Sequence, residues 1–380
     1  MSRNYFKAVA ILVGTVLGAG IFAVPYVIQK AGILSILIYF PILLSIQLTL
    51  HLFYAEIVLA NSEKHRMVGY VGYYFNGFFK KIAFFIALLG KNGTLLAYII
   101  LGGLFLHQLL SPRWGGTEFF YTIILFIIET AIVLFGLKMI ARAEAFLTVL
   151  LVLAIAGLSW RSLGFWNVDN YELINLKNLL LPYGVVFFAI GGQSAIPEIC
   201  RLLEKEKRKI RSAIIWGTIL PVVLIAFFAF LVIGVTGVET SSDVMLGLST
   251  QLDNSMMVPA LIFGLLAIVT SYIIISQSLR EVYWWDQGID KNLAWLLAAG
   301  VPFLLYLIGI RNLTGVIGLT GAITGGLYGI ILIAVYYRVK EAKNSKRRTI
   351  FKGNLRKRMA IFLSLAFVLG TILEIWNYFK

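Results

Sequence analysis

Two short stretches combine residues that break a helix with groups that can bind a ligand. They are Gly14-Thr15-Val16-Leu17-Gly18-Ala19-Gly20-Ile21-Phe22-Ala23-Val24-Pro25 and Phe187-Phe188-Ala189-Ile190-Gly191-Gly192-Gln193-Ser194-Ala195-Ile196-Pro197. An interior glycine costs a helix about 1 kcal/mol relative to alanine, and a proline about 3 kcal/mol. Inside a membrane, backbone leaves helical geometry only where protein or a cavity surrounds it. Because both stretches interrupt apolar segments, they predict two broken helices that line a binding site. The alternative is that the glycines serve close helix packing.

The chemistry of two such breaks points to a zwitterion. Unwinding leaves N–H groups at the start of one half-helix and carbonyls at the end of the other without partners. The N–H groups and the positive end of the helix dipole favour a carboxylate. The carbonyls suit an ammonium group or a metal cation. An amino acid satisfies both sets, so the backbone predicts an amino acid substrate and leaves its side chain open.

Neighbouring side chains add candidates for the same site. Thr270 and Ser271 lie at the middle of a later apolar segment, where their hydroxyls could complete a cation site with carbonyls of the first break. The alternative is that these two hydroxyls donate to backbone carbonyls of their own helix, as Ser and Thr hydroxyls often do. Phe188 abuts the second break, as a gate over the substrate or as plain packing, and Tyr98 is a further candidate for the pocket wall.

Two ionisable residues lie within apolar segments. Lys91 and Glu129 fall at similar depth in adjacent segments, so we expect them to form a structural ion pair. Intramembrane ionisable residues are functional candidates by default, and uptake of a coupling proton by either residue is the alternative. Glu56 and Glu198, near the inner ends of their segments, are interpreted as inner-gate or capping residues.

The elements that carry these residues are membrane spans. Of the 380 residues, 60% are hydrophobic and 13% charged, with a mean hydropathy of +0.89. A spanning helix needs about 20 apolar residues. The sequence predicts eleven such segments, without a cleavable signal, at residues 6–28, 32–60, 81–110, 118–137, 143–164, 179–200, 210–236, 258–285, 292–309, 313–337 and 359–379.

The positive charges predict the orientation of the spans. With the N-terminus inside, 26 of the 33 Lys and Arg residues fall on inner segments and 6 on outer ones. Because such asymmetry sets membrane topology, we expect a cytoplasmic N-terminus and an external C-terminus in the plasma membrane. The basic runs are then topology signals, and the net charge of +15 does not indicate nucleic acid. The single cysteine, Cys200, excludes a disulfide within the chain, and three scattered histidines give no metal-ligand spacing.

The breaks recur at matching places in two halves of the chain. The first lies in span one and the second in span six, so the two broken spans run in opposite directions. This pattern is expected of an inverted repeat. We therefore predict one transmembrane domain over residues 1–380, with one repeat at about 6–164, a second at about 179–337 and an extra helix at about 359–379.

The two stretches resemble motifs of a known family. The Gly14–Pro25 stretch resembles the first-span motif of the aromatic amino acid permeases for tryptophan and tyrosine, and the Phe188–Pro197 stretch is similar to their sixth-span motif. Thr270-Ser271-Tyr272, followed by Asp286, resembles their eighth-span pattern. These permeases belong to the amino acid/auxin permease branch of the amino acid–polyamine–organocation superfamily.

The resemblance implies a five-plus-five inverted repeat of α-helices, discontinuous helices 1 and 6, and alternating access. It implies that the substrate's charged ends meet Thr15, Gly18, Ala19 and Gly20 of the first break and Phe188, Ala189, Ile190 and Gly191 of the second. A coupling cation would meet Gly14, Leu17, Thr270 and Ser271. Two positions depart from the pattern: Gln193 stands where the aromatic permeases commonly carry His, and Gly14 stands where sodium-coupled neutral amino acid permeases carry Asn.

Together these observations predict a secondary active transporter of amino acids, neutral or aromatic, that works by ion-coupled symport. A proton is favoured over sodium as the coupling cation, with Lys91 as an additional coupling candidate and Gln193 and Tyr98 as substrate contacts. No cofactor is expected. An enzyme is disfavoured because no span carries a catalytic cluster. A uniporter or exchanger, and a nontransporting amino acid sensor of the same fold, remain alternatives.

Overall fold

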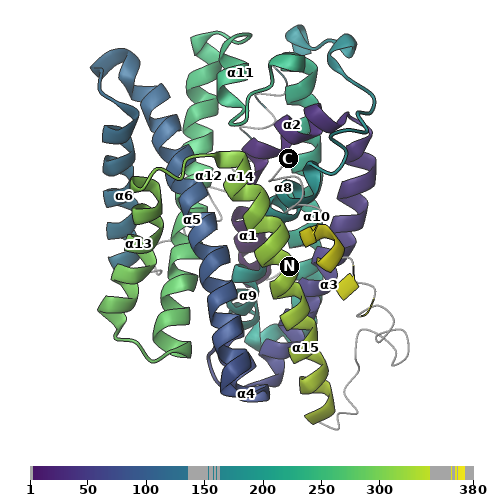
Figure 1. Ribbon diagram of the computed structural model, residues 1–380, viewed down its shortest axis with the longest axis vertical. Helices are drawn as coiled ribbons and strands as arrows, with labels where there is room; N and C mark the ends of the chain where they lie inside the picture. Colours follow the sequence, from purple (N-terminus) through teal and green to yellow (C-terminus); the bar gives the residue numbers. More distant parts are fainter. Residues whose placement is uncertain are drawn as a thin grey trace.

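The computed structural model describes residues 3–135 and 163–342, together with Leu153, Gly157, Trp160, Ile361, Ser364, Leu365 and residues 367–372. Within these ranges the chain is helical and contains no strand (Figure 1). The predicted spans at 143–164 and 359–379 lie largely outside the described residues. The principal helices are α1 (Arg3–Val16), α2 (Gly20–Ala31), α3 (Ser35–Ala60), α4 (Met67–Tyr74), α5 (Gly77–Trp114), α6 (Glu118–Phe135), α8 (Pro182–Ala189), α9 (Ile196–Leu202), α10 (Lys207–Thr236), α11 (Met245–Ser249), α12 (Asn254–Glu281), α13 (Lys291–Leu307), α14 (Leu313–Leu319) and α15 (Gly326–Ala342).

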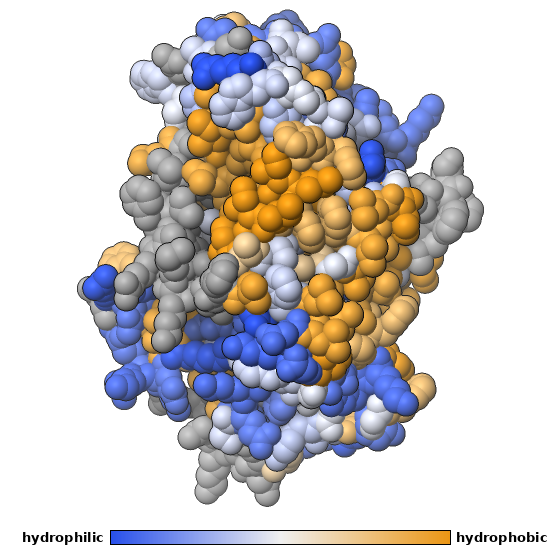
Figure 2. Space-filling view, turned by 90° about the vertical axis from the view of Figure 1, so that its left-hand side faces the viewer, coloured by the Kyte–Doolittle hydropathy of each residue, from blue (hydrophilic) through white to orange (hydrophobic). Residues whose placement is uncertain are grey.

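The described helices fit a membrane. Six are long and apolar enough to cross a bilayer, or seven if the bent pair α1 and α2 forms one span. Figure 2 shows apolar residues gathered across the middle of one face, with hydrophilic residues toward both ends. Water is absent from the bilayer core, so the backbone groups there must be satisfied within helices. The chain is thus an all-helical integral membrane protein, as the sequence predicts.

The first break lies at the glycines and not at the proline. Helix α1 ends at Val16, α2 begins at Gly20, and the two helices are bent by 52°. Leu17, Gly18 and Ala19 join them, and the Gly18 N–H donates to the Val16 carbonyl at 2.9 Å. Pro25 lies inside α2. A membrane helix accommodates a proline when its surroundings compensate for the lost hydrogen bond.

The second break separates α8 from α9. Helix α8 ends at Ala189, and Ile190, Gly191 and Gly192 lead into a single 3₁₀ turn, η3 (Gln193–Ala195). Pro197 occupies the first turn of α9, where its missing N–H would have had no partner. Pro197 therefore stands at the start of a half-helix, whereas Pro25 lies inside one.

Two π-helical turns and α4 were not predicted from the sequence. The turns are η6 (Val282–Asp286), which follows α12, and η7 (Thr320–Gly325), which lies between α14 and α15. Turn η7 packs against α8, where a Cβ on Gly321 would lie 2.9 Å from the Phe188 Cβ. Single π turns inside α-helices are frequent at functional sites. Helix α4 lies at the lower end of the molecule in Figure 1.

The helices form two groups. Helices α5, α6, α12 and α13 contact one another on one side, and α10 contacts α1, α2, α3 and α9 on the other (Figure 1). The two breaks belong to the second group. They face α5 and α12 of the first group, and the site lies between them.

Candidate functional site

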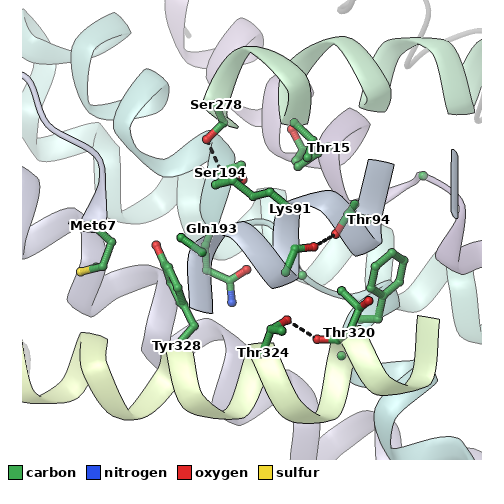
Figure 3. A pocket seen from close by; sticks show the side chains of 18 of the residues that line it. Thr15, Met67, Lys91, Thr94, Gln193, Ser194, Ser278, Thr320, Thr324 and Tyr328 are labelled. Carbon is green, nitrogen blue, oxygen red and sulfur yellow. Dashed lines mark hydrogen bonds between the residues drawn. The ribbon is translucent and has the colours of Figure 1, made fainter. Parts of the chain in front are cut away.

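A pocket lies where the two breaks face α5, α12 and η7. Its atom-free space is about 1020 Å³, which includes the part that opens to solvent. Figure 3 shows its polar side chains arranged around a central space, with Lys91 and Thr94 of α5 opposite Thr320 and Thr324 of η7. The pocket thus brings together polar groups from helices that are distant in the sequence.

Most of the predicted substrate-binding residues line this pocket. The lining members are Thr15, Gly18, Gly20, Tyr98, Phe188, Ala189, Gly191 and Gln193. The other two, Ala19 and Ile190, are fully buried within the breaks. Neither of these two residues lines the pocket.

Glycines let the first break come close to its neighbours. A Cβ on Gly18 would lie 2.6 Å from the Tyr98 hydroxyl and 2.9 Å from the Ser271 hydroxyl. A Cβ on Gly20 would lie 2.6 Å from the Ala189 Cβ of the second break. These distances are too short for real side chains, so the spacing of glycines permits direct backbone contact between the breaks.

Several backbone N–H groups at the breaks are left free for a ligand. Within the described residues, the N–H groups of Ala19, Gln193 and Ser194 make no hydrogen bond, whereas those of Ile190 and Gly191 bond to carbonyls of α8. Ala19 precedes α2, and Gln193 and Ser194 precede α9. The positive ends of two half-helices therefore present unpaired donors at the breaks.

The predicted cation-site residues are only partly brought together. Ser271 donates to the Gly14 carbonyl at 3.1 Å, which links α12 to the first break. Thr270 instead bonds back to its own helix, at the Leu266 and Ala267 carbonyls. Leu17 is fully buried. The self-bonding alternative therefore holds for Thr270 and not for Ser271.

The expected ion pair between Lys91 and Glu129 is wrong. The Lys91 ammonium donates to the hydroxyls of Ser194, at 3.0 Å, and Ser278, at 2.8 Å (Figure 3). Glu129 is buried, and neither carboxylate oxygen has a hydrogen-bond partner among the described residues. Lys91 faces the second break and α12. Helix α6 packs on α5 with Leu125 against Gly102 and Thr122 against Gly103, so Glu129 lies beside the part of α5 near Tyr98 and not beside Lys91. Counting residues from the ends of the predicted spans gives neither this register nor the direction in which a helix face points.

A charge cluster centred on the buried Arg66 borders the pocket. Arg66, which precedes α4, pairs with Glu281 at 2.5 Å and with Glu198 at 3.0 Å, and donates to the Ser194 carbonyl at 2.8 Å. Burial by itself lowers the pKa of Arg66, but the two carboxylates outweigh it and raise the pKa above its usual range. Asp286 accepts the Arg66 backbone N–H at 3.1 Å. The cluster thus ties together the α3–α4 loop, α9 and the end of α12.

The sequence indicated only part of this cluster. Glu198 was predicted as an inner-end residue, whereas Arg66 and Glu281 were not singled out. The available signal was the presence of two carboxylates at the ends of two predicted spans, near an arginine in a short loop. The other predicted inner-end residue, Glu56, pairs with Lys340 of α15.

A polar pair on α3 was also missed. His51 accepts the Gly192 N–H at Nε2 (3.2 Å) and contacts the Thr218 hydroxyl of α10 through Nδ1 (2.9 Å). Gln47 lies one turn earlier on α3 and lines the pocket. The spacing of two polar residues four apart in an apolar span was the signal that could have found them.

Comparisons with known proteins agree with this architecture. The model of the tryptophan/tyrosine permease family matches residues 1–376. Among solved structures, Mhp1, a nucleobase-cation-symport-1 family transporter in a closed conformation with bromovinylhydantoin bound, superposes with a TM-score of 0.69 at 15% identity. The match covers 98% of this chain and 90% of Mhp1. A comparison with curated protein sequences gives no match. Because the family model spans nearly the whole sequence, the chain belongs to the tryptophan/tyrosine permease family.

Proposed function

We propose that the protein carries a neutral or aromatic amino acid across the plasma membrane in symport with a cation, by alternating access of the pocket between the two breaks. Family membership indicates a membrane transporter of amino acids rather than an enzyme. The observation that carries the finer proposal is that both breaks line one pocket and that the second break presents unpaired N–H groups there.

The substrate's charged ends are assigned to the backbone. Its carboxylate would accept from the free N–H groups of Gln193 and Ser194, which both line the pocket. Its ammonium group would donate to carbonyls at the ends of α1 and α8, where the helices unwind. The side chain would then extend toward Tyr98, Phe188 and the η7 wall.

Lys91 is the proposed coupling group, and a proton the proposed ion. Its ammonium lies in the pocket and bridges Ser194 of the second break to Ser278 of α12. A neutral lysine amine has one N–H donor fewer than the ammonium and no charge, so deprotonation would weaken this bridge. Sodium is less well supported, because Ser271 already bonds the Gly14 carbonyl and Thr270 bonds its own helix.

Uptake into proteoliposomes tests this proposal. Labelled tryptophan and tyrosine are offered under an imposed proton gradient or sodium gradient. We expect accumulation that follows the proton gradient, needs no sodium and is abolished by a protonophore. Lys91→Met should lose accumulation but keep exchange of internal for external substrate, because only the coupling step is removed.

The alternatives give different results in the same assay. Equilibration that ignores both gradients would identify a uniporter or exchanger. Binding of the amino acid without uptake would identify a sensor. Accumulation by Lys91→Met at the wild-type level would contradict the role of Lys91 and leave symport standing.

A further inference from the structure

Gln47 is a buried amide that faces the pocket without a partner. Its side chain belongs to α3 and is only 1% exposed. Neither its Nε2 nor its Oε1 has a hydrogen-bond partner within the described part of the chain. His51, one turn away, has both ring nitrogens engaged. The two neighbours on α3 therefore differ, since one is satisfied by the protein and the other is not.

An unsatisfied amide is costly unless a ligand completes it. Each buried donor or acceptor left without a partner costs about 1–3 kcal/mol, and folded proteins keep few of them. Because Gln47 lines the pocket, a bound molecule can supply the missing partners. The position is thus that of a recognition group.

Gln47 and Gln193 form one polar corner. Gln47 Nε2 and Gln193 Oε1 each lie 3.5 Å from the place that a Cβ on Gly191 would occupy. The missing side chain of Gly191 leaves the space between the two carboxamides open. A group held there would meet an acceptor and a donor at once.

The corner lies away from the first break. In Figure 3 the Gln193 carboxamide points toward the side of the pocket that carries Thr324 and Tyr328, and Thr15 of the first break lies on the opposite side. The proposed function already assigns the substrate's carboxylate to free N–H groups and its ammonium group to carbonyls at the breaks. The corner is therefore placed to meet the substrate's side chain.

We propose that Gln47 is a specificity-determining residue whose carboxamide hydrogen-bonds a polar group on the substrate's side chain, with Gln193 as the second contact. This inference rests on the proposed transport function. A carboxamide oxygen accepts from an indole N–H or a phenol O–H, and its NH₂ donates to a phenol oxygen. A site with such groups rejects an analogue that lacks the hydrogen-bonding atom, because its own polar groups are then left unpaired.

The test compares kcat/KM for uptake of tyrosine, tryptophan and phenylalanine by the wild-type protein and by Gln47→Met. Methionine has a similar shape and no amide. The wild type should prefer tyrosine or tryptophan over phenylalanine by about tenfold or more, the factor expected of one hydrogen bond. Gln47→Met should lose most of that preference while keeping phenylalanine uptake. Gln193→Met should shift the ratio in the same direction.

Gln29→Met is the matched control. Gln29 of α2 is also buried with an unpartnered Oε1 among the described residues, but it does not line the pocket. Its variant should keep the wild-type ratio.

An equal fall for all three substrates in Gln47→Met, or an unchanged ratio, would overturn the inference and leave transport standing. Equal wild-type uptake of the three would overturn it even if the variants failed to fold. Absence of any amino acid uptake would instead refute the proposed function, and this inference with it.

Discussion

At the residue scale, His51 holds the second break in place. Its Nε2 accepts the Gly192 N–H, so the ring proton must lie on Nδ1 and be donated to Thr218. This arrangement fixes a neutral ring and one tautomer. The residue is fully buried, so no water can replace either contact. His51 thus supplies the acceptor that unwinding took from Gly192.

Replacing His51 should destabilise the protein. In His51→Leu the Gly192 N–H becomes a buried donor without a partner, at a cost of about 1–3 kcal/mol. We expect a lower midpoint of thermal unfolding in detergent. Thr218→Val leaves the buried His51 Nδ1–H without an acceptor and should cost a similar amount. An unfolding midpoint of His51→Leu equal to that of the wild type would show that the Gly192 bond contributes nothing.

Arg66 should be the most sensitive residue of the charge cluster. Its removal leaves Glu281, whose side chain is 3% exposed, as a buried charge without its partner. Breaking such a pair costs about 3–5 kcal/mol. We expect Arg66→Met to lower the unfolding midpoint strongly, and Arg66→Met with Glu281→Gln to recover part of the loss. Strictly additive effects of the two substitutions would contradict the pairing.

His65 should make the stability of this end depend on pH. Its hydrogen bond to Asp286 raises the pKa of His65 above its ordinary value of 6.5, although partial burial opposes the shift. A raised pKa means that the stabilising contribution is complete below about pH 6.5 and is lost as the pH rises through the folded-state pKa. Unfolding midpoints measured from pH 5.5 to 8.5 should fall more steeply for the wild type than for His65→Asn. Parallel curves would rule out this contribution.

At the scale of elements, the site depends on how closely α2 and α8 approach. A Cβ on Gly20 would lie 2.6 Å from the Ala189 Cβ, so Gly20→Ala must push the two half-helices apart. We expect both amino acid uptake and thermal stability to fall. Gly77→Ala is the control, because nothing lies within 4 Å of a Cβ at that position at the start of α5. Wild-type uptake by Gly20→Ala would mean that the breaks need not touch.

The sequence predicted the breaks but misplaced the role of one proline. Glycines and prolines inside apolar runs are visible because they contradict the helix that the membrane demands. Pro25 lies within α2 and Pro197 begins α9, and the two look alike in sequence. The π turns η6 and η7 were missed because a change from one hydrogen-bond spacing to another needs no particular residue type. The sequence could identify Gly18 and Gln193 as site residues by their place at the breaks. Gln47 and Arg66 stand out in the sequence only as polar residues in or near apolar spans, and the packing of distant helices brings them to the site.

At the scale of the molecule, the pocket lies between two groups of helices. Motion of the group that carries the breaks against α5, α6, α12 and α13 would open the pocket to one side and then the other. The Arg66 cluster joins both groups, through Glu198 of α9 and Glu281 of α12. The ion pairs of the Arg66 cluster would therefore have to break whenever the pocket opens at the end where α4 lies.

The proposed orientation can be tested with single cysteines. In a Cys200→Ser background, which removes the natural cysteine, Glu63→Cys and Ser242→Cys introduce thiols at exposed positions of the α3–α4 and α10–α11 loops. We expect a membrane-impermeant maleimide to label Ser242→Cys in intact cells and Glu63→Cys only after the membrane is opened. The reverse pattern would place the α4 end outside and contradict the charge-based topology.

Because the two breaks meet at one pocket, the proposed site requires two charged groups on the ligand. Both an ammonium group and a carboxylate should be needed, because each is assigned to a different set of backbone groups. The most direct measurement is competition for binding of labelled tryptophan or tyrosine to the purified protein. The competitors are the unlabelled amino acid, the matching amine without a carboxylate and the matching acid without an amine. We predict that only the intact amino acid displaces the label at comparable concentration. If either truncated analogue displaces the label as effectively as the intact amino acid does, a site built from both breaks is contradicted.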